Sequence, residues 1–333
     1  MHMADALVSP AVGGSMWAVS AGAIAWCSRK VRDGQDERQV PLMGVLGAFV
    51  FASQMINFAI PGTGSSGHLG GGLLLALLLG PHAAFLAIAS VLVVQAFFFA
   101  DGGLLALGCN MFNLGIIPSF LAYPLVFRPL AGSHPSRARF ATATTVAAVV
   151  GAQLGALGVV LQTTASGIAE LPPAAFAGVM LPIHLPIGVV EGMITAAVAS
   201  FISKASPAFQ NMASHAPASS TRRRFFVPAV LVFALLIAGI CSRYASALPD
   251  GLDWSIQRVA GAASSPSFGV HGVFGRIQEK LSPMPDYAFR KTAGTDEGES
   301  AAASSVAGIV GAIATMLAVV LCGAILKRSQ ANR

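Results

Sequence analysis

Residues 83–100 read AAFLAIASVLVVQAFFFA, a stretch without a single charged side chain. A helix needs about 20 mostly apolar residues to cross the hydrocarbon core of a bilayer, so this stretch predicts a membrane-spanning helix. The whole chain has the same character. Of its 333 residues, 55% are hydrophobic and 10% are charged, whereas a soluble domain carries about 25% charged residues. We therefore predict an all-α membrane protein that crosses the bilayer several times.

Further apolar stretches on both sides of 83–100 predict nine spans in total. The third of them is short and rich in glycine. An odd number of spans puts the two ends of the chain on opposite sides of the membrane. The predicted spans are 11–28, 41–60, 69–81, 83–100, 104–127, 141–163, 176–203, 226–244 and 304–326.

Basic residues predict the orientation, because cytoplasmic loops are enriched in Lys and Arg. In this scheme fourteen of the twenty basic residues fall on one side, and the short loops opposite carry none. The other six lie in the segment 245–303, which is too long to follow the rule. We therefore expect the N-terminus outside and the C-terminus inside. The fourteen residues are Arg29, Lys30, Arg32, Arg38, Arg128, Arg137, Arg139, Lys204, Arg222, Arg223, Arg224, Lys327, Arg328 and Arg333.

Composition also divides the chain. Residues 204–224 are rich in Ser, Ala and Pro and end in a basic run, as expected of a cytoplasmic linker. A seven-span body, 1–203, precedes this linker, and a two-span hairpin with the external polar loop 245–303 follows it within 225–333. No basic stripe with interleaved aromatic residues occurs, so the positive charge does not indicate nucleic-acid binding. The four cysteines are isolated, which argues against a disulfide framework.

The chain begins MHMADALVSP and has no Lys or Arg before Arg29, so it lacks the basic region of a signal peptide. The α-amine of Met1, the deprotonated amide of His2 and the His2 imidazole can chelate one metal ion through three nitrogens in a plane. His68, at the outer end of the third predicted span, could supply a fourth nitrogen. Such a set suits Ni(II) or Cu(II) better than Zn(II) or Mg(II). The alternative is an incidental Met-His start, with His68 merely at a helix entry.

Four other polar residues are weaker candidates. Glu191 is the sole Asp or Glu inside a predicted span, and His184 lies seven residues before it on the same helix face. Glu191 could support the metal site, act in gating or coupling, or form a hydrogen bond to another helix. Asn57 and Ser66, in the predicted loop 57–68, could contact the groups that hold the metal.

A protease is the alternative from another class. The sequence GSSG at 64–67 matches the G-x-S-G pattern of rhomboid-type intramembrane proteases, with Ser66 as nucleophile and His184 or His82 as the base. The match is short, and it leaves the Met-His start unexplained. No Walker A motif occurs, so the chain is not expected to hydrolyse ATP.

Several motifs in order resemble one known family. MHMADALVSP at the start, NFAIPGTGSSGHLGGG at 57–72, QAFFFADGGLLALGCNMFNLG at 95–115 and HLPIGVVEGMITA at 184–196 are similar to the CbiM/NikM family, over about residues 1–203. The stretch LPDGLDWSI at 248–256 resembles the PDGLE motif of the small CbiN/NikN subunits, with Asp253 in place of the Glu. The chain therefore resembles a fusion of the two, closest to a nickel NikMN fusion.

The resemblance implies a fold and a function. It implies a seven-helix bundle like the substrate-binding components of energy-coupling-factor importers, plus a two-helix hairpin, in the cell (inner) membrane. It implies capture of Ni(II) or Co(II) as transported substrate by Met1, His2 and His68, without a permanent cofactor or enzymatic activity. A coupling membrane protein and cytoplasmic ATPase subunits are the implied partners. The planar nitrogen set favours nickel over cobalt, which remains the alternative.

Overall fold

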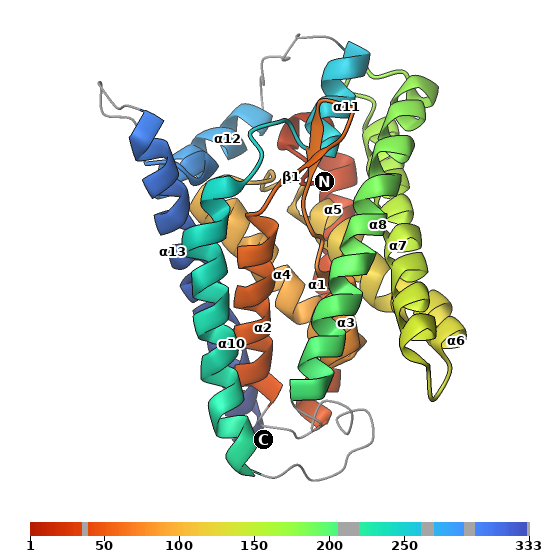
Figure 1. The fold of residues 1–333 in the computed structure, drawn as a ribbon. Coiled ribbons are helices and arrows are strands. Elements are labelled where there is room, and N and C mark those ends of the chain that lie inside the picture. The colour runs from red at the N-terminus through yellow and green to blue at the C-terminus, as the bar shows by residue number, and fades with distance from the viewer. Residues whose placement is uncertain (35–38, 206–219, 261–269, 290–296, 332–333) are drawn as a thin grey trace.

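The computed structural model describes residues 1–34, 39–205, 220–260, 270–289 and 297–331. Long helices run roughly along one direction, and several of the short elements gather at the upper end (Figure 1). The long helices are α1 (Pro10–Asp33), α2 (Gln39–Gln54), α4 (Pro81–Phe99), α7 (Arg137–Ser166), α8 (Pro173–Ala205), α10 (Ser220–Ile240) and α13 (Glu297–Ala331). A further long segment joins α5 (Leu107–Met111), the wide-turned helix η2 (Phe112–Phe127) and α6 (Arg128–Ala131).

The short elements complete the fold. They are η1 (Asp5–Leu7), β1 (Phe58–Ile60), β2 (Ser65–Gly67), α3 (Gly72–Leu79), η3 (Cys241–Tyr244), α11 (Gly251–Ala260), α12 (Val270–Leu281) and η4 (Pro285–Tyr287). Thus the predicted loop 245–303 contains helices in its described part. The predicted linker 204–224 lies mostly outside the described residues.

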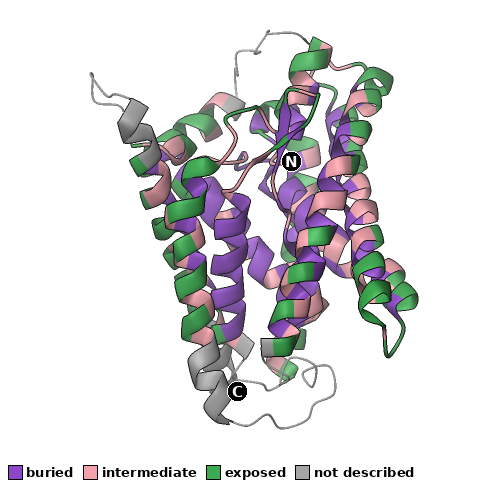
Figure 2. Ribbon diagram, in the orientation of Figure 1, coloured by how far each residue is buried: buried purple, intermediate pink, exposed green. Residues whose placement is uncertain are grey.

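Within the described residues, six helical segments are long and apolar enough to cross a bilayer, so this is a multi-pass membrane protein. They are Pro81–Phe99, Leu107–Ala131, Arg137–Ser166, Pro173–Lys204, Val227–Tyr244 and Ala302–Ala324, with the shorter apolar helix Val40–Gln54 beside them. The predicted spans 11–28 and 41–60 correspond to α1 and α2. The outward faces of α10 and α13 are exposed in Figure 2 and carry large apolar side chains such as Leu236 and Leu321, as a surface against lipid requires.

The predicted span 69–81 is wrong in length. The helix found there, α3, has 8 residues, and at 1.5 Å per residue it extends about 12 Å, less than half the hydrocarbon thickness. The glycines cause this. Gly71 precedes the helix with a φ of 77°, and Gly80 follows it with a φ of 79°, a backbone conformation that ends regular structure and that glycine adopts readily.

The C-terminal region, defined as residues 220–331, packs mainly on α2. Helices α10 and α13 both contact α2, and close approach depends on small residues, as is common between membrane helices. A Cβ atom at Gly311 of α13 would collide with the ring of Phe51, which is fully buried. Residues 1–205 are called the N-terminal region below.

Two parts of the upper end position the candidate site. Strands β1 and β2 form an antiparallel hairpin in which Phe58 pairs with Gly67. The segment Pro249–Asp250 of the C-terminal region docks on this hairpin, because the N–H of Ser66 donates to the Pro249 carbonyl at 2.8 Å. The N-terminus lies beside the hairpin and α11, whereas α13 ends at the opposite end of the molecule (Figure 1). Which end faces outside remains a prediction.

Candidate metal centre

The first residues of the chain enter the interior as an anchored segment. Met3 is fully buried. Its N–H donates to Oδ1 of Asn110 at 2.7 Å, and its carbonyl accepts the N–H of Gly103 at 2.9 Å. The carboxylate of Asp5 accepts the N–H of Ala106 at 2.9 Å. These bonds fix the backbone on both sides of Met3 and so place Met1 and His2.

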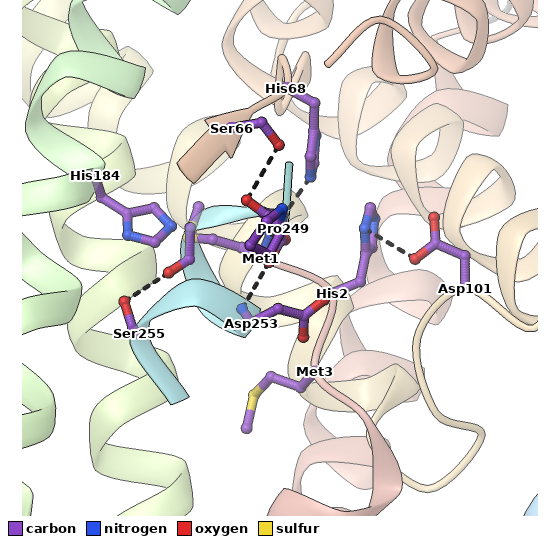
Figure 3. A network of polar contacts seen from close by, with 12 residues as sticks. Met1, His2, Met3, Ser66, His68, Asp101, His184, Pro249, Asp253 and Ser255 are labelled. Atoms are coloured by element: carbon purple, nitrogen blue, oxygen red, sulfur yellow. Dashed lines mark hydrogen bonds and ion pairs between the residues drawn. The ribbon is translucent and has the colours of Figure 1, made fainter. Parts of the chain in front are cut away.

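The α-amine of Met1 lies between two partners. It donates to Oδ2 of Asp250 at 2.8 Å and lies 3.4 Å from Nε2 of His68 (Figure 3). Asp250 is held in turn by its own loop, since its Oδ1 accepts the N–H of Asp253 at 2.8 Å. The ammonium of Met1 and the other contacts lower the pKa of the Asp250 carboxyl well below its usual range, although burial acts in the opposite direction. A carboxylate of the C-terminal region therefore pairs with the first atom of the chain.

Nε2 of the His68 imidazole has a free lone pair that can accept a hydrogen bond or bind a metal. Its Nδ1 lies 3.0 Å from the carbonyl of Leu69. Because a carbonyl can only accept, Nδ1 carries the proton and Nε2 keeps its lone pair. Burial, followed by the charges of the Met1 ammonium and His2, lowers the pKa of His68 to about 3. The ring is therefore neutral at physiological pH, which is the form that binds metals.

His2 stacks on His68. The ring centroids are 5.1 Å apart and the ring planes differ by 7°. Nδ1 of His2 lies 3.3 Å from Oδ1 of Asp101, whose other oxygen accepts the hydroxyl of Tyr287 at 2.5 Å. Burial lowers the pKa of His2, an effect that the charge of Asp101 partly opposes. A chain of contacts thus runs from His2 through Asp101 to the C-terminal region.

The distances suit neighbouring ligands of one ion. With metal–nitrogen bonds of about 2.0 Å, adjacent corners of a square are about 2.8 Å apart. The Met1 amine and Nε2 of His68 are 3.4 Å apart, about 0.6 Å more than the separation of adjacent ligands at such bond lengths. Within the described residues no group of three or more His, Cys, Asp and Glu side chains is placed to hold a metal ion. A metal here would therefore need backbone nitrogens as well.

His184 and Glu191 border the same small space. A cavity of about 10 Å³ is lined by Met1, His68, His184, Glu191 and Asp250, among others, and this volume is near the minimum that holds one water molecule. Nδ1 of His184 bonds the Met180 carbonyl at 2.7 Å, and one oxygen of Glu191 accepts the N–H of Gly71 at 3.0 Å. This bond joins α8 to Gly71, the residue that precedes α3, and the role of Glu191 stays a prediction.

Ser66 and Asn57 support the docked segment instead. The hydroxyl of Ser66 donates to the Leu248 carbonyl at 2.7 Å, and the carbonyl of Asn57 accepts the N–H of Ser246 at 2.8 Å. The hydroxyl bonds recorded for Ser66 go to carbonyl oxygens and not to a histidine, and Ser66 is fully buried. Nothing in this arrangement supports a rhomboid-type nucleophile.

Sequence reasoning missed three residues at this site. Asp250 belongs to the LPDGLDWSI stretch, which indicated a family but not a contact 249 residues away. Asp101 directly follows the predicted span 83–100 and Tyr287 lies in the predicted loop 245–303, and the sequence marks neither as a site residue. The PDGLE-like stretch, found in one chain with a Met-His start, is the one signal in the sequence that includes Asp250.

Comparisons with known proteins match both parts of the chain. Residues 2–209 match the family described as CbiM, cobalt uptake substrate-specific transmembrane region, and residues 224–328 match the PDGLE domain. A crystal structure titled as a transition metal transporter is 29% identical, with a TM-score of 0.54, and covers 61% of this chain and 93% of its own. A crystal structure of a truncated transition metal transporter is 28% identical, with a TM-score of 0.53, and covers 61% of this chain and 99% of its own.

Curated relatives carry transport names. A protein of Haloquadratum walsbyi that is named for metal transport is 36% identical over 62% of this chain and 92% of its own. A protein named as a fused nickel transport protein in Rhodobacter capsulatus is 29% identical over 86% of this chain and 88% of its own. A cobalt transport protein of Geobacter sulfurreducens is 28% identical over 62% of this chain and 60% of its own. The chain therefore belongs to the CbiM family of cobalt and nickel transport membrane components, and carries a CbiN-like PDGLE domain in the same polypeptide.

Proposed function

We propose that this protein captures nickel at the outer face of the cell (inner) membrane for an ATP-driven importer of the energy-coupling-factor type. The observation that carries the proposal is the 3.4 Å separation between the Met1 amine and Nε2 of His68, with the His2 ring stacked on His68. In the proposed site the ion binds the Met1 amine, the His2 amide nitrogen, Nδ1 of His2 and Nε2 of His68. The metal is substrate, not a permanent cofactor.

Nδ1 is the ring nitrogen of His2 that can take part. It closes a small chelate ring with the amide nitrogen of the same residue through Cα, Cβ and Cγ, whereas Nε2 points away from that ring. In the structure Nδ1 faces Asp101 and the amine faces Asp250. Binding therefore exchanges two carboxylate contacts for the metal. His184, Glu191, Asn57 and Ser66 are proposed to support the ligands and the docked segment without binding the ion.

The planar nitrogen set favours nickel among the candidate ions. Square-planar nitrogen coordination is typical of Ni(II) and Cu(II), whereas Zn(II) prefers a tetrahedron and Mg(II) prefers oxygen. Copper binds such donors more tightly by the Irving–Williams order, so discrimination against copper depends on its availability. Cobalt is the second candidate, since relatives in the same family are named as cobalt transport proteins.

The partners follow from the same proposal. No Walker A sequence occurs in the chain, so ATP hydrolysis falls to separate ATPase subunits, which act through a coupling membrane protein. Residues 1–203 are proposed to form the metal-binding unit and 225–333 the accessory unit, joined by a cytoplasmic linker. The N-terminus is proposed to lie outside, on the side where the ion arrives.

Proton release upon nickel binding tests the donor set. An ammonium has no lone pair, so the Met1 amine must lose one proton and the His2 amide a second, whereas the neutral imidazoles lose none. We expect about two protons released per nickel near pH 7.5, and an affinity that rises with pH. Titration calorimetry in buffers with different ionisation enthalpies gives the count. A count near zero would exclude both an ionised His2 amide in the nickel complex and a protonated Met1 amine paired with Asp250 before nickel binds.

A further inference from the structure

Two buried polar atoms in neighbouring side chains lack an ordinary partner beside the candidate site. They are Nε2 of His2 and Oε1 of Gln95, and neither makes a hydrogen bond of normal geometry to any described residue. The Gln95 side chain is nevertheless a hydrogen-bonding neighbour of His2. The His2 side chain is 8% exposed and Gln95 is 1% exposed. Because an unpaired buried polar group costs free energy, this pair calls for an explanation.

The orientation of the Gln95 amide follows from a chain of hydrogen bonds. Nε2 of Gln54 donates to the carbonyl of Gly70 at 2.8 Å. A carbonyl can only accept, so the amide nitrogen of Gln54 is at this end and its Oε1 is at the other. That Oε1 accepts Nε2 of Gln95 at 2.8 Å. The atom of Gln95 that is left for His2 is therefore Oε1, which also can only accept.

An acceptor at this place decides which nitrogen of His2 carries the proton. The ring must donate from Nε2 to satisfy Oε1 of Gln95, and a neutral imidazole with its proton on Nε2 has its lone pair on Nδ1. Nδ1 is the ring nitrogen of His2 in the proposed donor set. The ion would displace the contact between Nδ1 and Asp101 but would leave Nε2 to Gln95. The tautomer that Gln95 favours is thus the one that metal binding requires.

The second imidazole of the site is held in a corresponding way. Nδ1 of His68 donates to the carbonyl of Leu69 at 3.0 Å, which leaves Nε2 for the ion. Histidines that bind metals almost always donate their other N–H to a carbonyl, a carboxylate or water, which fixes the ring and raises the basicity of the ligand. For His68 the backbone supplies this carbonyl. For His2 the amide of Gln95 is placed to supply it.

The amide chain also links the two histidines. Gln54 is the last residue of α2 and is 6% exposed, and Gln95 lies within α4. The chain ends at Gly70, two residues after His68. The two rings stack, with planes that differ by 7°. Gln54 and Gln95 therefore connect one ring to the backbone beside the other through two buried side chains.

We propose that Gln95 is a positioning residue of the metal site, whose Oε1 accepts Nε2–H of His2 when nickel is bound and so holds the ring with Nδ1 toward the ion. The inference rests on the proposed function and deepens it. Gln95 does not bind the ion in this proposal. Gln54 keeps the Gln95 amide in the orientation that presents oxygen to His2.

The first test is nickel titration of the purified full-length protein. Gln95→Met has nearly the same shape but no acceptor at this place, and loss of such a partner typically weakens metal binding about 10- to 100-fold. Gln95→Glu keeps an oxygen acceptor and should recover most of the affinity. The matched control is Gln153→Met, which removes another amide bond between helices, from α7 to the Leu181 carbonyl of α8 at 3.0 Å. This control should bind nickel as wild type does.

The second readout is the visible absorption band of planar nickel at saturation. Its position reports the strength of the ligand field and not the amount of ion bound. An imidazole that loses its hydrogen-bond acceptor is a weaker base, so the band of Gln95→Met should lie at longer wavelength, and that of Gln95→Glu should return toward wild type. Gln54→Met, which frees the Gln95 amide to turn, should shift the band in the same direction and serves if Gln95→Met does not fold.

Wild-type affinity in Gln95→Met would overturn the positioning role of Gln95. So would a weaker affinity with an unmoved band and an equal loss in Gln95→Glu, because that result would describe a merely structural side chain. If Gln95→Met does not fold, an unmoved band in Gln54→Met would overturn it. Absence of a planar nickel band from the wild type itself would overturn the proposed function instead.

Discussion

Replacing His2 with alanine should abolish nickel binding by the purified protein and nickel accumulation by cells that depend on it. The substitution removes one proposed ligand and opens a chelate ring. Loss of a group that merely supports a metal ligand costs about 10- to 100-fold in affinity, so loss of the ligand itself should exceed 100-fold. Equilibrium titration with nickel and uptake of radioactive nickel measure the two effects.

The fold should survive this change. Met3 and Asp5 hold the segment through bonds to Asn110, Gly103 and Ala106 that do not involve the His2 side chain. The matched control is His134→Ala, which removes an exposed imidazole from the connection between α6 and α7. Wild-type uptake by the His2→Ala variant would refute the role of this residue.

Inserting one alanine between Met1 and His2 should have an equally large effect on transport, by a different route. Because Met3 is anchored, the added residue displaces the amine by up to about 3.8 Å and separates it from His68 and Asp250. The new start, Met-Ala-His, offers an amine, two amides and an imidazole, which make up four nitrogens on their own. We expect nickel uptake to be lost, while any nickel still bound no longer requires His68.

The measurement is nickel titration of the insertion variant with and without His68→Ala. We expect His68→Ala to leave the nickel affinity of the insertion variant unchanged and to lower greatly the nickel affinity of the protein without the insertion. This result would show that His68 is a nickel ligand only when histidine is the second residue. If the insertion variant still depended on His68, or transported nickel normally, the proposed chelate would be wrong.

Local chemistry explains which elements could be predicted from the sequence. The uninterrupted apolar stretch 83–100 became α4 (Pro81–Phe99), within two residues at each end. The prediction for 41–60 fails at its end, where α2 stops at Gln54 and the apolar residues Phe58–Ile60 pair as a strand. Hydrophobicity cannot separate a short helix from a strand that is buried by tertiary contacts.

The residues of the candidate site also differ in how far they could be predicted from the sequence. The spacing of donors along Met1 and His2 is a property of two adjacent residues, so their capacity to chelate could be derived from sequence. Asp250 and Tyr287 reach the site through docking of a distant segment, and no local pattern encodes that docking. His68 lies between these cases. Its place at the outer end of the third predicted span could be derived from the sequence, but only the fold brings its Nε2 to the amine.

The metal content of the purified protein tests the central claim most directly. Wild type and His68→Ala should be isolated from cells supplied with equal nickel and cobalt and analysed by mass spectrometry of the metals. We predict about one nickel per wild-type chain, with less cobalt, and at least a tenfold lower content in His68→Ala. Equal metal content in the two proteins would contradict a site built from the N-terminus and His68.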